Sequence, residues 1–481
     1  MAVAQLPTPA LRAQRLAQVD VAELERRLRE RVDGEVRFDA GSRGTYATDA
    51  SNFRHVPLGV VVPRTVDAGA EAVAVCRELG APVVSRGGGT SLAGQSCNVA
   101  VVLDWSTYCH RVVSIDAERR TAVVEPGLVL DELNAAAEPY GLQFGPKPAT
   151  HSHCTLGGMI GNNSCGSTAQ AFGTTAQSVR RLEIVTYDGL RTWVGPTSAD
   201  EYDEIVAAGG ARAELYRGLR AIADEFGDEV RRRFPDIPRR ISGYNLDALL
   251  PEGGFDLAKA LTGSEATLVT ILRAEVALVP LVPRRRFVAL GYSSLVDAAR
   301  AVPAVNEHRP LIVEGMDSRL VRYERSQHVD PAVLDLLPEG DGWLVVELGA
   351  DDDETLRARV ADFRSSLEGS ARSFREYDER EAEHLMWVRE DALGATAHPH
   401  DLRRTWPGWE DSAVPPDRLG DYLEDFNRLL DEFGFGEASR YGHFGHGCLH
   451  ISIPFDLTTA DGVAAYRAFL DRAAHLVAHC G

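Results

Sequence analysis

A glycine-rich segment, SRGGGTSLAGQS at residues 85–96, places the strongest constraint on how this chain can fold. It follows directly on a short apolar segment, APVVS, that has the composition of a β-strand. The three consecutive glycines permit positive φ angles and let backbone N–H groups converge on an anion without Cβ obstruction. Thr90, Ser91 and Gln95 add side-chain donors. The segment is neither a Walker loop nor a G-x-G-x-x-G fingerprint, so it predicts either an anion-binding loop of another type or a plain glycine turn.

Two further segments are built in a similar way. In KPATHSHCTLGGMIGNNSCGSTAQAFGTT (147–175), glycines alternate with small polar residues over one irregular stretch. A chain so poor in bulky side chains lets a flat ring system and a pyrophosphate lie against its backbone. In LTGSEATLVTILRAEVALVP (261–280), Gly263-Ser264-Glu265 opens what we expect to be an apolar strand.

The order of expected elements divides the chain into two parts. Short apolar strands alternate with helices up to about residue 280, which favours an α+β or α/β domain. The expected strands there are 58–65, 81–85, 99–105 and 120–127, and the expected helices are 66–79 and 128–140. From residue 281, strands at 285–294 and 343–350 each precede a long polar helical stretch, which predicts a second sheet covered on one face by helices. The Gly-, Pro-, His- and Trp-rich stretch 394–418 predicts an ordered loop.

Composition excludes several classes of protein. The net charge of −20 over 481 residues argues against a nucleic-acid partner. No apolar run reaches the length needed to span a bilayer, and the N-terminus lacks the apolar core of a secretion signal. Seven cysteines without C-x-x-C spacing argue against a disulfide framework or an iron–sulfur cluster within these residues, and fit a reducing cytoplasm.

A histidine cluster stands near the end of the chain, in RYGHFGHGCLHISIPF (440–455). If GCLHISI is a strand, His446, Cys448 and His450 share one face, and His443 lies on the preceding turn. Two neutral imidazoles with a carboxylate make a reasonable zinc or manganese site with open positions. The alternative is that these are polar or core histidines without a metal.

Together these segments resemble a known family. The two glycine segments, GSEATL, WVREDALGATA, GWEDSAVPPDRLGDYL and YGHFGHGCLH resemble the FAD-linked D-2-hydroxy acid dehydrogenases (the D-lactate, D-2-hydroxyglutarate and glycolate enzymes). These belong to the vanillyl-alcohol oxidase/p-cresol methylhydroxylase flavoprotein superfamily, and the resemblance is closest to bacterial members fused to a C-terminal iron–sulfur domain. It runs from about residue 45 to the C-terminus.

The resemblance implies an α+β fold with a two-part FAD-binding domain of the p-cresol methylhydroxylase type and a substrate or cap domain whose antiparallel sheet is covered by helices. We expect an N-terminal helical lead-in at 1–54, the FAD-binding domain at 55–280 and the cap domain at 281–481. The cap domain includes the histidine segment and is expected to stop before a final flavin-side element.

The family motifs also assign residues to FAD. Arg86 to Ser91 and Gln95 would hold the pyrophosphate, a second group would line the rest of the cofactor, and Glu265 with Val269 would close the site. The full set is Arg86, Gly87, Gly88, Gly89, Thr90, Ser91, Gln95, Pro148, Gly157, Gly158, Asn162, Ser164, Gly166, Glu265 and Val269. The first loop has glycine where covalently flavinylated relatives often have histidine, so we expect non-covalent FAD. His151 and His153 lie in the second segment.

The resemblance also assigns metal ligands and points to the catalytic base. His443 and His450 match the family's two metal-binding histidines, and His446 replaces its usual aspartate. The third ligand and the favoured base lie in a later S-G-E-H-G-type element in the family. The sequence ends at Gly481, just where that element would be approached, so we expect a piece of a longer protein or a partner chain to supply it.

Three residues are candidates for contact with the substrate. Arg389 in WVRED matches the arginine that binds the substrate carboxylate, with Arg440 as second choice. Tyr244 lies in a family-like loop close to flavin, and the alternative is that it only anchors that loop. We count Arg389, His446 and Tyr244 as the candidate catalytic residues. Trp409 and Glu410 stand where the D-2-hydroxyglutarate branch usually has a basic residue.

The resemblance implies an FAD-dependent dehydrogenase that oxidises D-lactate or D-2-hydroxyglutarate to the 2-oxo acid. Electrons would pass to an acceptor other than oxygen, either a protein or an iron–sulfur domain or subunit. The alternative is a non-catalytic FAD-binding subunit or fragment of a larger iron–sulfur dehydrogenase. A metal-dependent hydrolase would leave both glycine segments unexplained. We expect a cytoplasmic protein, either free or peripheral to the inner face of the membrane through its acceptor, and a homodimer is compatible with the sequence.

Overall fold

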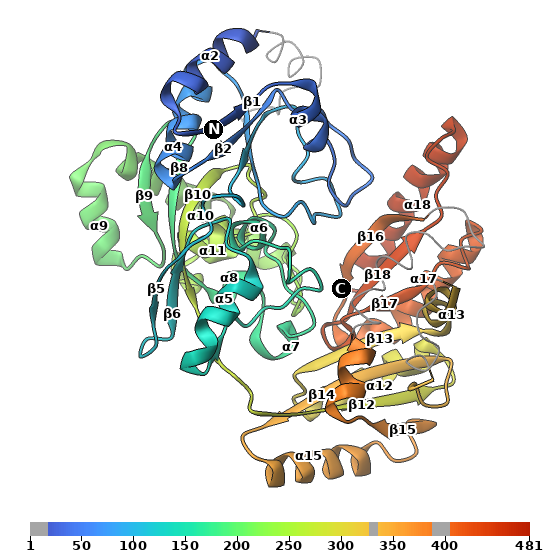
Figure 1. Cartoon of the computed structure of the whole chain (residues 1–481). Coiled ribbons are helices and arrows are strands. Elements are labelled where there is room, and N and C mark those ends of the chain that lie inside the picture. The colour runs from blue at the N-terminus through green and yellow to red at the C-terminus, as the bar shows by residue number, and fades with distance from the viewer. Residues whose placement is uncertain (1–17, 327–334, 387–404) are drawn as a thin grey trace.

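The computed structural model describes residues 18–326, 335–386 and 405–481, and the statements below concern those residues. Its elements form two halves that lie side by side in Figure 1. The first half holds two larger sheets and a small two-stranded one and runs to about residue 280, and the second is built on one large sheet. Within the described ranges, no helix combines the length and apolarity needed to span a membrane.

The first sheet has the strand order β1-β2-β4-β3. Its strands are β1 (Gly34–Arg37), β2 (Gly59–Pro63), β3 (Val83–Arg86) and β4 (Val101–Asp104). The last three run parallel, and β2 and β4 are buried along their whole length, as their continuous apolar sequences predict. Helices α2 (Val21–Arg31) and α4 (Val66–Glu78) share a core with this sheet, and the short α3 (Ala40–Thr45) precedes β2.

The expected lead-in at 1–54 is therefore not purely helical. GEVRF in this stretch alternates apolar and polar residues, and β1 pairs antiparallel with β2, so the stretch adds an edge strand to the first sheet. Residues 1–17 lie outside the described part.

The second sheet is antiparallel, with the order β5-β6-β10-β8-β9. Its strands are β5 (Val112–Asp116), β6 (Thr121–Val124), β8 (Val179–Thr186), β9 (Arg191–Val194) and β10 (Val269–Ala277). The accompanying helices are α5 (Leu130–Ala137), α6 (Leu156–Asn162), α7 (Ala169–Phe172), α8 (Thr175–Ser178), α9 (Ala199–Ala208), α10 (Gly210–Arg233) and α11 (Leu257–Leu261). Smaller elements are η1 (Glu138–Tyr140), β7 (Leu142–Gln143), η2 (Leu246–Leu249), η3 (Pro251–Gly253) and β11 (Val279–Pro280).

The third sheet, in the second half, has seven strands in the order β15-β12-β14-β13-β17-β18-β16, and every pair is antiparallel. The strands are β12 (Arg284–Tyr292), β13 (Ile312–Asp317), β14 (Gly342–Ala350), β15 (Ser373–Glu376), β16 (Trp406–Ala413), β17 (Arg440–Gly442) and β18 (Cys448–Ile453). We call this half the cap. Its sheet confirms the α+β class expected from the sequence.

One face of the cap sheet is covered by helices and the other carries the functional groups. Leu344, Val346 and Leu348 of β14 point into the large core formed with α12 (Leu295–Glu307), α15 (Asp353–Ser366), α17 (Leu419–Glu432) and α18 (Ala460–His479). Trp343 and Val345 alternate to the opposite face, in a smaller core with α13 (Ser318–Ser326). The short helices η4 (Pro416–Arg418) and η5 (Phe444–His446) complete the cap.

The stretch 394–418 is not a loop throughout. Residues 406–413 form β16, which pairs with β18, and residues 394–404 lie outside the described part. The proline and glycine that suggested a loop are accommodated because the pairing shifts register on both sides of Trp409.

Candidate functional site

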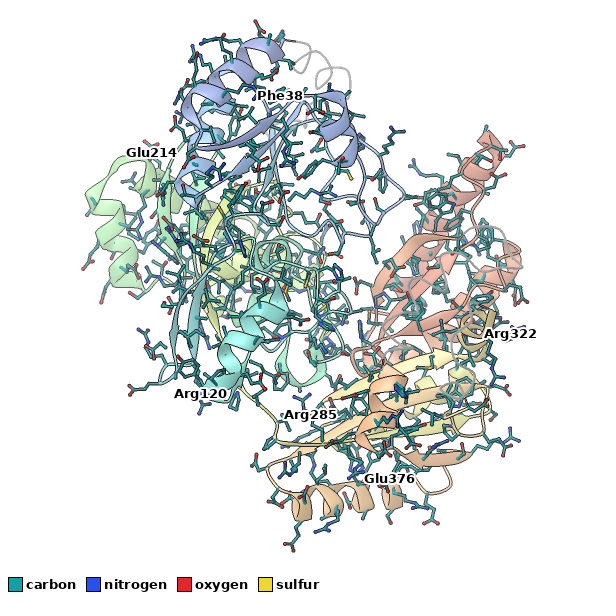
Figure 2. The ribbon with its side chains drawn as sticks, viewed as in Figure 1. Phe38, Arg120, Glu214, Arg285, Arg322 and Glu376 are labelled. Carbon is teal, nitrogen blue, oxygen red and sulfur yellow. The ribbon has the colours of Figure 1, made fainter. Side chains whose placement is uncertain are left out.

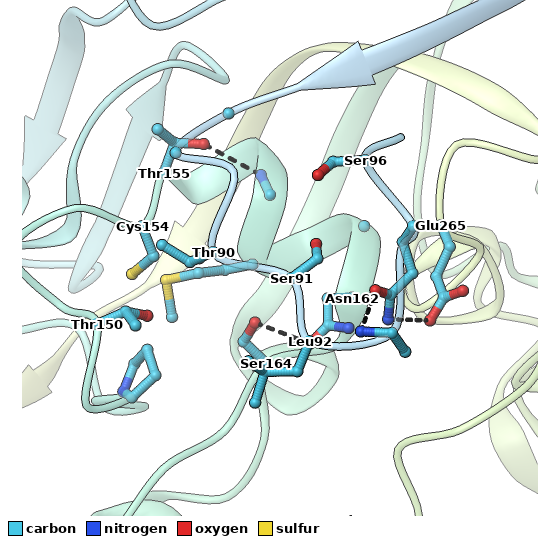
Figure 3. Close-up of a pocket in the computed structure, with 18 of the residues that line it drawn as sticks. Thr90, Ser91, Leu92, Ser96, Thr150, Cys154, Thr155, Asn162, Ser164 and Glu265 are labelled. Atoms are coloured by element: carbon cyan, nitrogen blue, oxygen red, sulfur yellow. Dashed lines mark hydrogen bonds between the residues drawn. The ribbon is translucent and has the colours of Figure 1, made fainter. Parts of the chain in front are cut away.

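The three glycine-rich segments line one pocket, and the cap closes its other side. Figure 3 shows Thr90 and Ser91 of the first segment, Asn162 and Ser164 of the second and Glu265 of the third around the same space. The cap contributes Glu410, Tyr441, His443 and His450, together with Asp411.

The first segment lies so close to the second that side chains are excluded. A Cβ on Gly87 would overlap the side chain of Thr155, and one on Gly88 would overlap the carbonyl of His153. Gly157 approaches Pro126 in the same way, with a Cβ position 2.7 Å from the proline ring. These glycines are therefore needed for backbone packing, which brings N–H groups to the pocket wall.

Gly161 has a different role. It lies on α6 and lines the pocket, yet a Cβ there would meet nothing within 4 Å. Thr155 caps the start of this helix by accepting a hydrogen bond from the N–H of Gly158 (3.3 Å), as Figure 3 shows. At Gly157, Gly158 and Gly161 the helix thus presents backbone to the pocket, which leaves room for a flat ring system, while Met159 and Asn162 add side chains to the wall.

The third segment is tied to the other two. The N–H of Glu265 donates to the carbonyl of Gly161 (2.8 Å), and the Gln95 amide donates to the Glu265 carboxylate (3.2 Å), a bond drawn in Figure 3. Glu265 and Ala266 both have positive φ angles, 52° and 59°. This turn closes one end of the pocket.

All fifteen residues that the sequence assigned to the cofactor lie on the wall of this one pocket. They are Arg86, Gly87, Gly88, Gly89, Thr90, Ser91, Gln95, Pro148, Gly157, Gly158, Asn162, Ser164, Gly166, Glu265 and Val269. The described lining residues do not include His151 or His153. The Nδ1 atom of His151 instead lies 2.7 Å from the Asp131 carboxylate.

Each of the two histidines on the cap side of the pocket is paired with a buried carboxylate. Nδ1 of His443 lies 2.6 Å from Oε1 of Glu314, and Nδ1 of His450 lies 2.8 Å from Oε2 of Glu410. An ionised carboxylate can only accept, so each ring nitrogen Nδ1 is placed to donate to its carboxylate, an arrangement that directs Nε2 of a neutral ring to act as an acceptor or ligand. The two rings meet edge to face with centroids 5.1 Å apart.

A third carboxylate, Asp411, lies beside His450 and bridges the two halves of the molecule. Its Oδ1 accepts from Nη2 and Nε of Arg239, at 2.9 and 3.1 Å. Arg239 is only 3% exposed and also donates to the carbonyl of Gly166, at 3.4 Å. Burial alone would raise the pKa of Asp411, but the positive charge of Arg239 holds that pKa well below its usual range.

The buried groups next to this cluster are neutral. Burial raises the pKa of the Cys448 thiol well above its usual value. Burial also lowers the pKa of His446 to about 4, with the charge of Arg239 adding to the effect.

The two candidate catalytic residues that fall within the described ranges, His446 and Tyr244, do not line the pocket. His446 does not share the strand face of Cys448 and His450, because the chain turns through η5 before β18 begins. Tyr244 is 44% exposed, and its hydroxyl hydrogen bonds to that of Thr267 (2.8 Å). The lining residues in the described part include neither His446 nor Tyr244, and Arg389 lies outside that part.

Arg440, the second choice for a carboxylate clamp, is directed away from the pocket. It is buried, its Nη1 donates to the carbonyls of Gly436 and Ala438, and its nearest carboxylate is Asp317 at 3.8 Å. It alternates with Tyr441 along β17, and Tyr441 is the residue that reaches the pocket.

Four charged residues of the site were missed from the sequence: Arg239, Glu314, Glu410 and Asp411. The signal for Glu314 is its place between apolar residues in a fully buried strand, IVEGMD, because a buried acidic residue needs a partner. Glu410 and Asp411 belong to the WED motif that the family comparison singled out, but without a role.

Comparisons with known proteins agree with this architecture. Residues 57–195 match the FAD binding domain family, and residues 282–481 match the family of C-terminal domains of FAD linked oxidases. A D-2-hydroxyglutarate dehydrogenase of Pseudomonas putida is 30% identical over 469 residues, 93% of this chain and 46% of that protein. The chain thus spans about half the length of this relative.

A shorter relative and a solved structure extend the comparison. A D-lactate dehydrogenase of Archaeoglobus fulgidus is 26% identical over 392 residues, covering 81% of this chain and 74% of that protein. The structure of p-cresol methylhydroxylase with substrate bound superposes with a TM-score of 0.61 at 14% identity, covering 98% of this chain and 88% of the other. That likeness establishes a shared fold.

Proposed function

We propose that this chain oxidises a D-2-hydroxy acid to the 2-oxo acid. It belongs to the FAD-linked flavoproteins, which join an FAD binding domain to a C-terminal domain of the FAD linked oxidases. D-2-hydroxyglutarate is the first candidate substrate, because the relative named for it has the higher identity of the two curated relatives given above. D-lactate is the second candidate. The observation that carries the proposal is the single pocket in which three glycine-rich segments face two histidines, each with its own carboxylate.

The pocket fits FAD, and we propose that FAD binds without a covalent link. The open space at Gly161 and the tight contact of Gly87 with Thr155 bring backbone to the pocket wall, beside polar side chains such as Ser91 and Asn162. His151, which could have formed a link, does not line the pocket and is held at Asp131.

We also propose a divalent metal ion, zinc or manganese, at His443 and His450. Glu314 and Glu410 fix the tautomer of the two rings so that Nε2 is the ligand atom, the arrangement found around metal-binding histidines generally. Two imidazoles bound to one tetrahedral ion have ring centroids about 5.2 Å apart, close to the observed 5.1 Å.

The reaction breaks the Cα–H bond and the hydroxyl O–H bond of the substrate and forms the C=O bond of the 2-oxo acid. When bound, FAD supplies the acceptor for the hydride, and the divalent ion supplies the charge that lowers the hydroxyl pKa. The residues of the chain provide the framework: Glu314 and Glu410 orient the imidazoles, and the cap closes over the glycine segments. Arg389 stays our proposed clamp for the substrate carboxylate, and His446 and Tyr244 stay predictions from the sequence.

The electrons need an acceptor, which we propose is an iron–sulfur domain or a partner protein rather than oxygen. All seven cysteines are free thiols, and they lie on separate elements without cluster spacing. This thiol chemistry suits the cytoplasm, our proposed location.

The test is the visible spectrum of the purified chain under anaerobic conditions. We expect a yellow protein whose flavin absorbance is bleached by D-2-hydroxyglutarate or D-lactate in the presence of zinc or manganese. The L-enantiomers serve as matched controls and should leave the absorbance unchanged. A colourless protein that cannot be reconstituted with FAD would contradict the cofactor, and a yellow protein that neither D-acid bleaches would contradict the reaction.

A further inference from the structure

A second groove lies in the cap between helix α15 and strand β15, which Figure 1 shows along the lower end of the cap. Its volume is about 920 Å³. The floor is apolar and consists of Leu290 from β12, Leu356 and Val360 from α15, and Phe374 from β15. Among the described residues, none that lines this groove also lines the pocket of the glycine-rich segments. The groove is therefore a second candidate binding site.

Strand β15 is an open edge of the cap sheet, since within the described ranges only β12 pairs with it. The N–H of Tyr377, directly after the strand, donates to the carbonyl of Phe287 on β12 (3.1 Å). Alternate residues of a strand face the same neighbour, so Phe374 and Glu376 direct their backbone N–H and C=O groups to the open edge. Their side chains line the groove. An extended peptide can pair with such an edge through its own backbone.

Helix α15 gives the groove a positively charged wall. Arg357 and Arg364 stand seven residues apart, about two helical turns, and therefore project from the same face. Both are exposed, and the guanidinium of Arg364 lies over the ring of Phe374, 5.3 Å from its centroid. In the part of the chain that the structure describes, neither arginine has a carboxylate partner. Their charge is therefore available to a ligand.

The carboxylates of the groove do not cancel this wall. Asp353 is held by Arg284 at 3.1 Å. Glu368 follows α15 and Glu376 ends β15, whereas Arg286 adds a third cation, whose hydrogen bond goes to a backbone carbonyl (3.3 Å). Positive charge thus exceeds negative charge in the groove, although the whole chain carries −20. An acidic ligand fits this excess better than a basic one.

We propose that the groove binds an extended acidic peptide segment of another protein, which adds a strand to β15 and directs acidic side chains to Arg357 and Arg364. Backbone hydrogen bonds with Phe374 and Glu376 set the register of the peptide, and the apolar floor takes up side chains that lie between the acidic ones. The two arginines select for acidic segments, because a guanidinium and a carboxylate form a charge-assisted hydrogen bond.

The first test is fluorescence anisotropy on the flavin-loaded full chain with a labelled peptide of four Val-Glu repeats, and with a Val-Lys peptide as its control. We expect saturable binding of the acidic peptide, weakened by added salt, and no binding of the basic one. Equal binding of the two peptides, or no binding of the acidic one, would overturn the proposal. The reaction at the other pocket is read separately from the flavin spectrum, so neither result decides the other.

The second test replaces the two wall arginines one at a time. Arg357→Ala and Arg364→Ala should each weaken binding of the acidic peptide by about 10–100-fold. Arg322→Ala is the control, because Arg322 is also exposed on the cap but lies well apart from Glu376 in Figure 2. Wild-type affinity in both wall variants would show that the acidic side chains bind elsewhere, and would overturn the assignment.

The third test examines the open edge at Glu376. Glu376→Pro removes only an N–H that faces away from β12, a change that an edge strand tolerates. We expect it to weaken binding of the acidic peptide, even though it also removes a negative charge. Glu376→Gln removes that charge alone and should not weaken binding. Equal affinities of the proline and glutamine variants would contradict strand addition at β15.

Discussion

The state of the two pocket histidines is set by residues that lie far from them in the sequence. Glu314 stands 129 positions from His443, and Glu410 stands 40 positions from His450. Strand pairing brings them together, since β13 pairs with β17 at Gly315 and Gly442. Each carboxylate holds the proton on Nδ1, so the lone pair of each ring is on the nitrogen that a metal needs.

The Glu410 carboxylate is therefore expected to control metal affinity. Glu410→Gln keeps the shape of the side chain but removes the negative charge that His450 Nδ1 faces at 2.8 Å. We expect zinc affinity measured by calorimetry to fall by about 10–100-fold. Glu432→Gln is the matched control, because Glu432 is an exposed carboxylate paired with Arg472 on the outer helices. Equal affinities of the two variants would show that Glu410 has no part in the site.

At the residue scale, the sequence predicted the imidazoles and missed the charges around them. His443 and His450 stand within eight residues of each other, and the family resemblance singled them out of that cluster. Glu314 and Arg239 become neighbours of the cluster only through the register of strands and the packing of the two halves. The periodicity of a single segment cannot predict which residues of distant segments become its neighbours.

At the scale of an element, helix α6 offers a way to separate cofactor binding from folding. Gly161 lines the pocket and a Cβ there meets nothing within 4 Å, so Gly161→Val should fold but place two methyl groups in the space of the cofactor. We expect the purified variant to be colourless and to take up no FAD when FAD is added, with its far-ultraviolet circular dichroism unchanged.

Gly218→Val is the matched control for that substitution. Gly218 lies on the exposed side of α10 and also has nothing within 4 Å of its Cβ position, so the change carries the same propensity cost in a helix. This variant should remain yellow. A yellow Gly161→Val protein would mean that the cofactor lies elsewhere.

Strand β14 carries a titratable group whose effect on stability can be predicted. Glu347 is 2% exposed, and burial raises its pKa from 4.5 to about 6 against the opposing charges of Arg285 and Lys147. Figure 2 shows Arg285 on the part of the cap nearest the first half. The folded protein thus binds more protons than the unfolded chain between these values. Stability from this group is fully present below pH 4.5 and is lost as the pH rises through 6.

Glu347→Gln should abolish that pH dependence. The loss in the wild type between pH 4.5 and pH 7 is about 2 kcal/mol from this residue, so the variant should be the more stable protein at pH 7. The free energy of unfolding from urea titrations across this range measures the effect, with the exposed Glu368→Gln as control. A variant that keeps the wild-type slope would place the titration in another group.

Among the strands, those with continuous apolar sequences could be predicted and those with mixed sequences could not. GVVVP, VVLD and LVVELG appear as β2, β4 and part of β14, where the sequence expected strands. Strand β16, WPGWEDSA, contains proline, glycine and two acids, and it forms because β18 offers a partner that tolerates its register shifts. The bulge in β16 also places Glu410 and Asp411 at the pocket. The irregularity that the sequence did not predict and the position of these functional residues are therefore the same feature.

At the scale of the molecule, the pocket exists only while the two halves remain joined. Arg239 belongs to the first half, and Asp411 to the cap, and their paired hydrogen bonds cross the boundary beside the pocket. Gln170 of α7 adds a bond to Asn306 of the cap (3.3 Å). Gln170 lies within the second glycine-rich segment and Arg239 donates to the carbonyl of Gly166 in the same segment, so cofactor site and cap are held in one arrangement.

Removing Asp411 should lower the free energy of unfolding more than removing Arg239 does. The Arg239 side chain is 3% exposed, whereas that of Asp411 is 33% exposed. Asp411→Asn strands a buried guanidinium and should cost about 3 kcal/mol of unfolding free energy. Asparagine also tolerates the positive φ at this position, so the backbone adds little to that cost. Arg239→Met leaves a carboxylate that water still reaches, and should cost less.

The double variant Arg239→Met/Asp411→Asn should therefore be more stable than the sum of the two single losses predicts, because neither charge is left without its partner. Urea unfolding of the flavin-loaded protein, with a chelator present to remove bound metal, measures all four members of the cycle. Strictly additive losses would mean that the two side chains act independently, and that the halves are joined by apolar packing and by contacts such as that of Gln170 with Asn306.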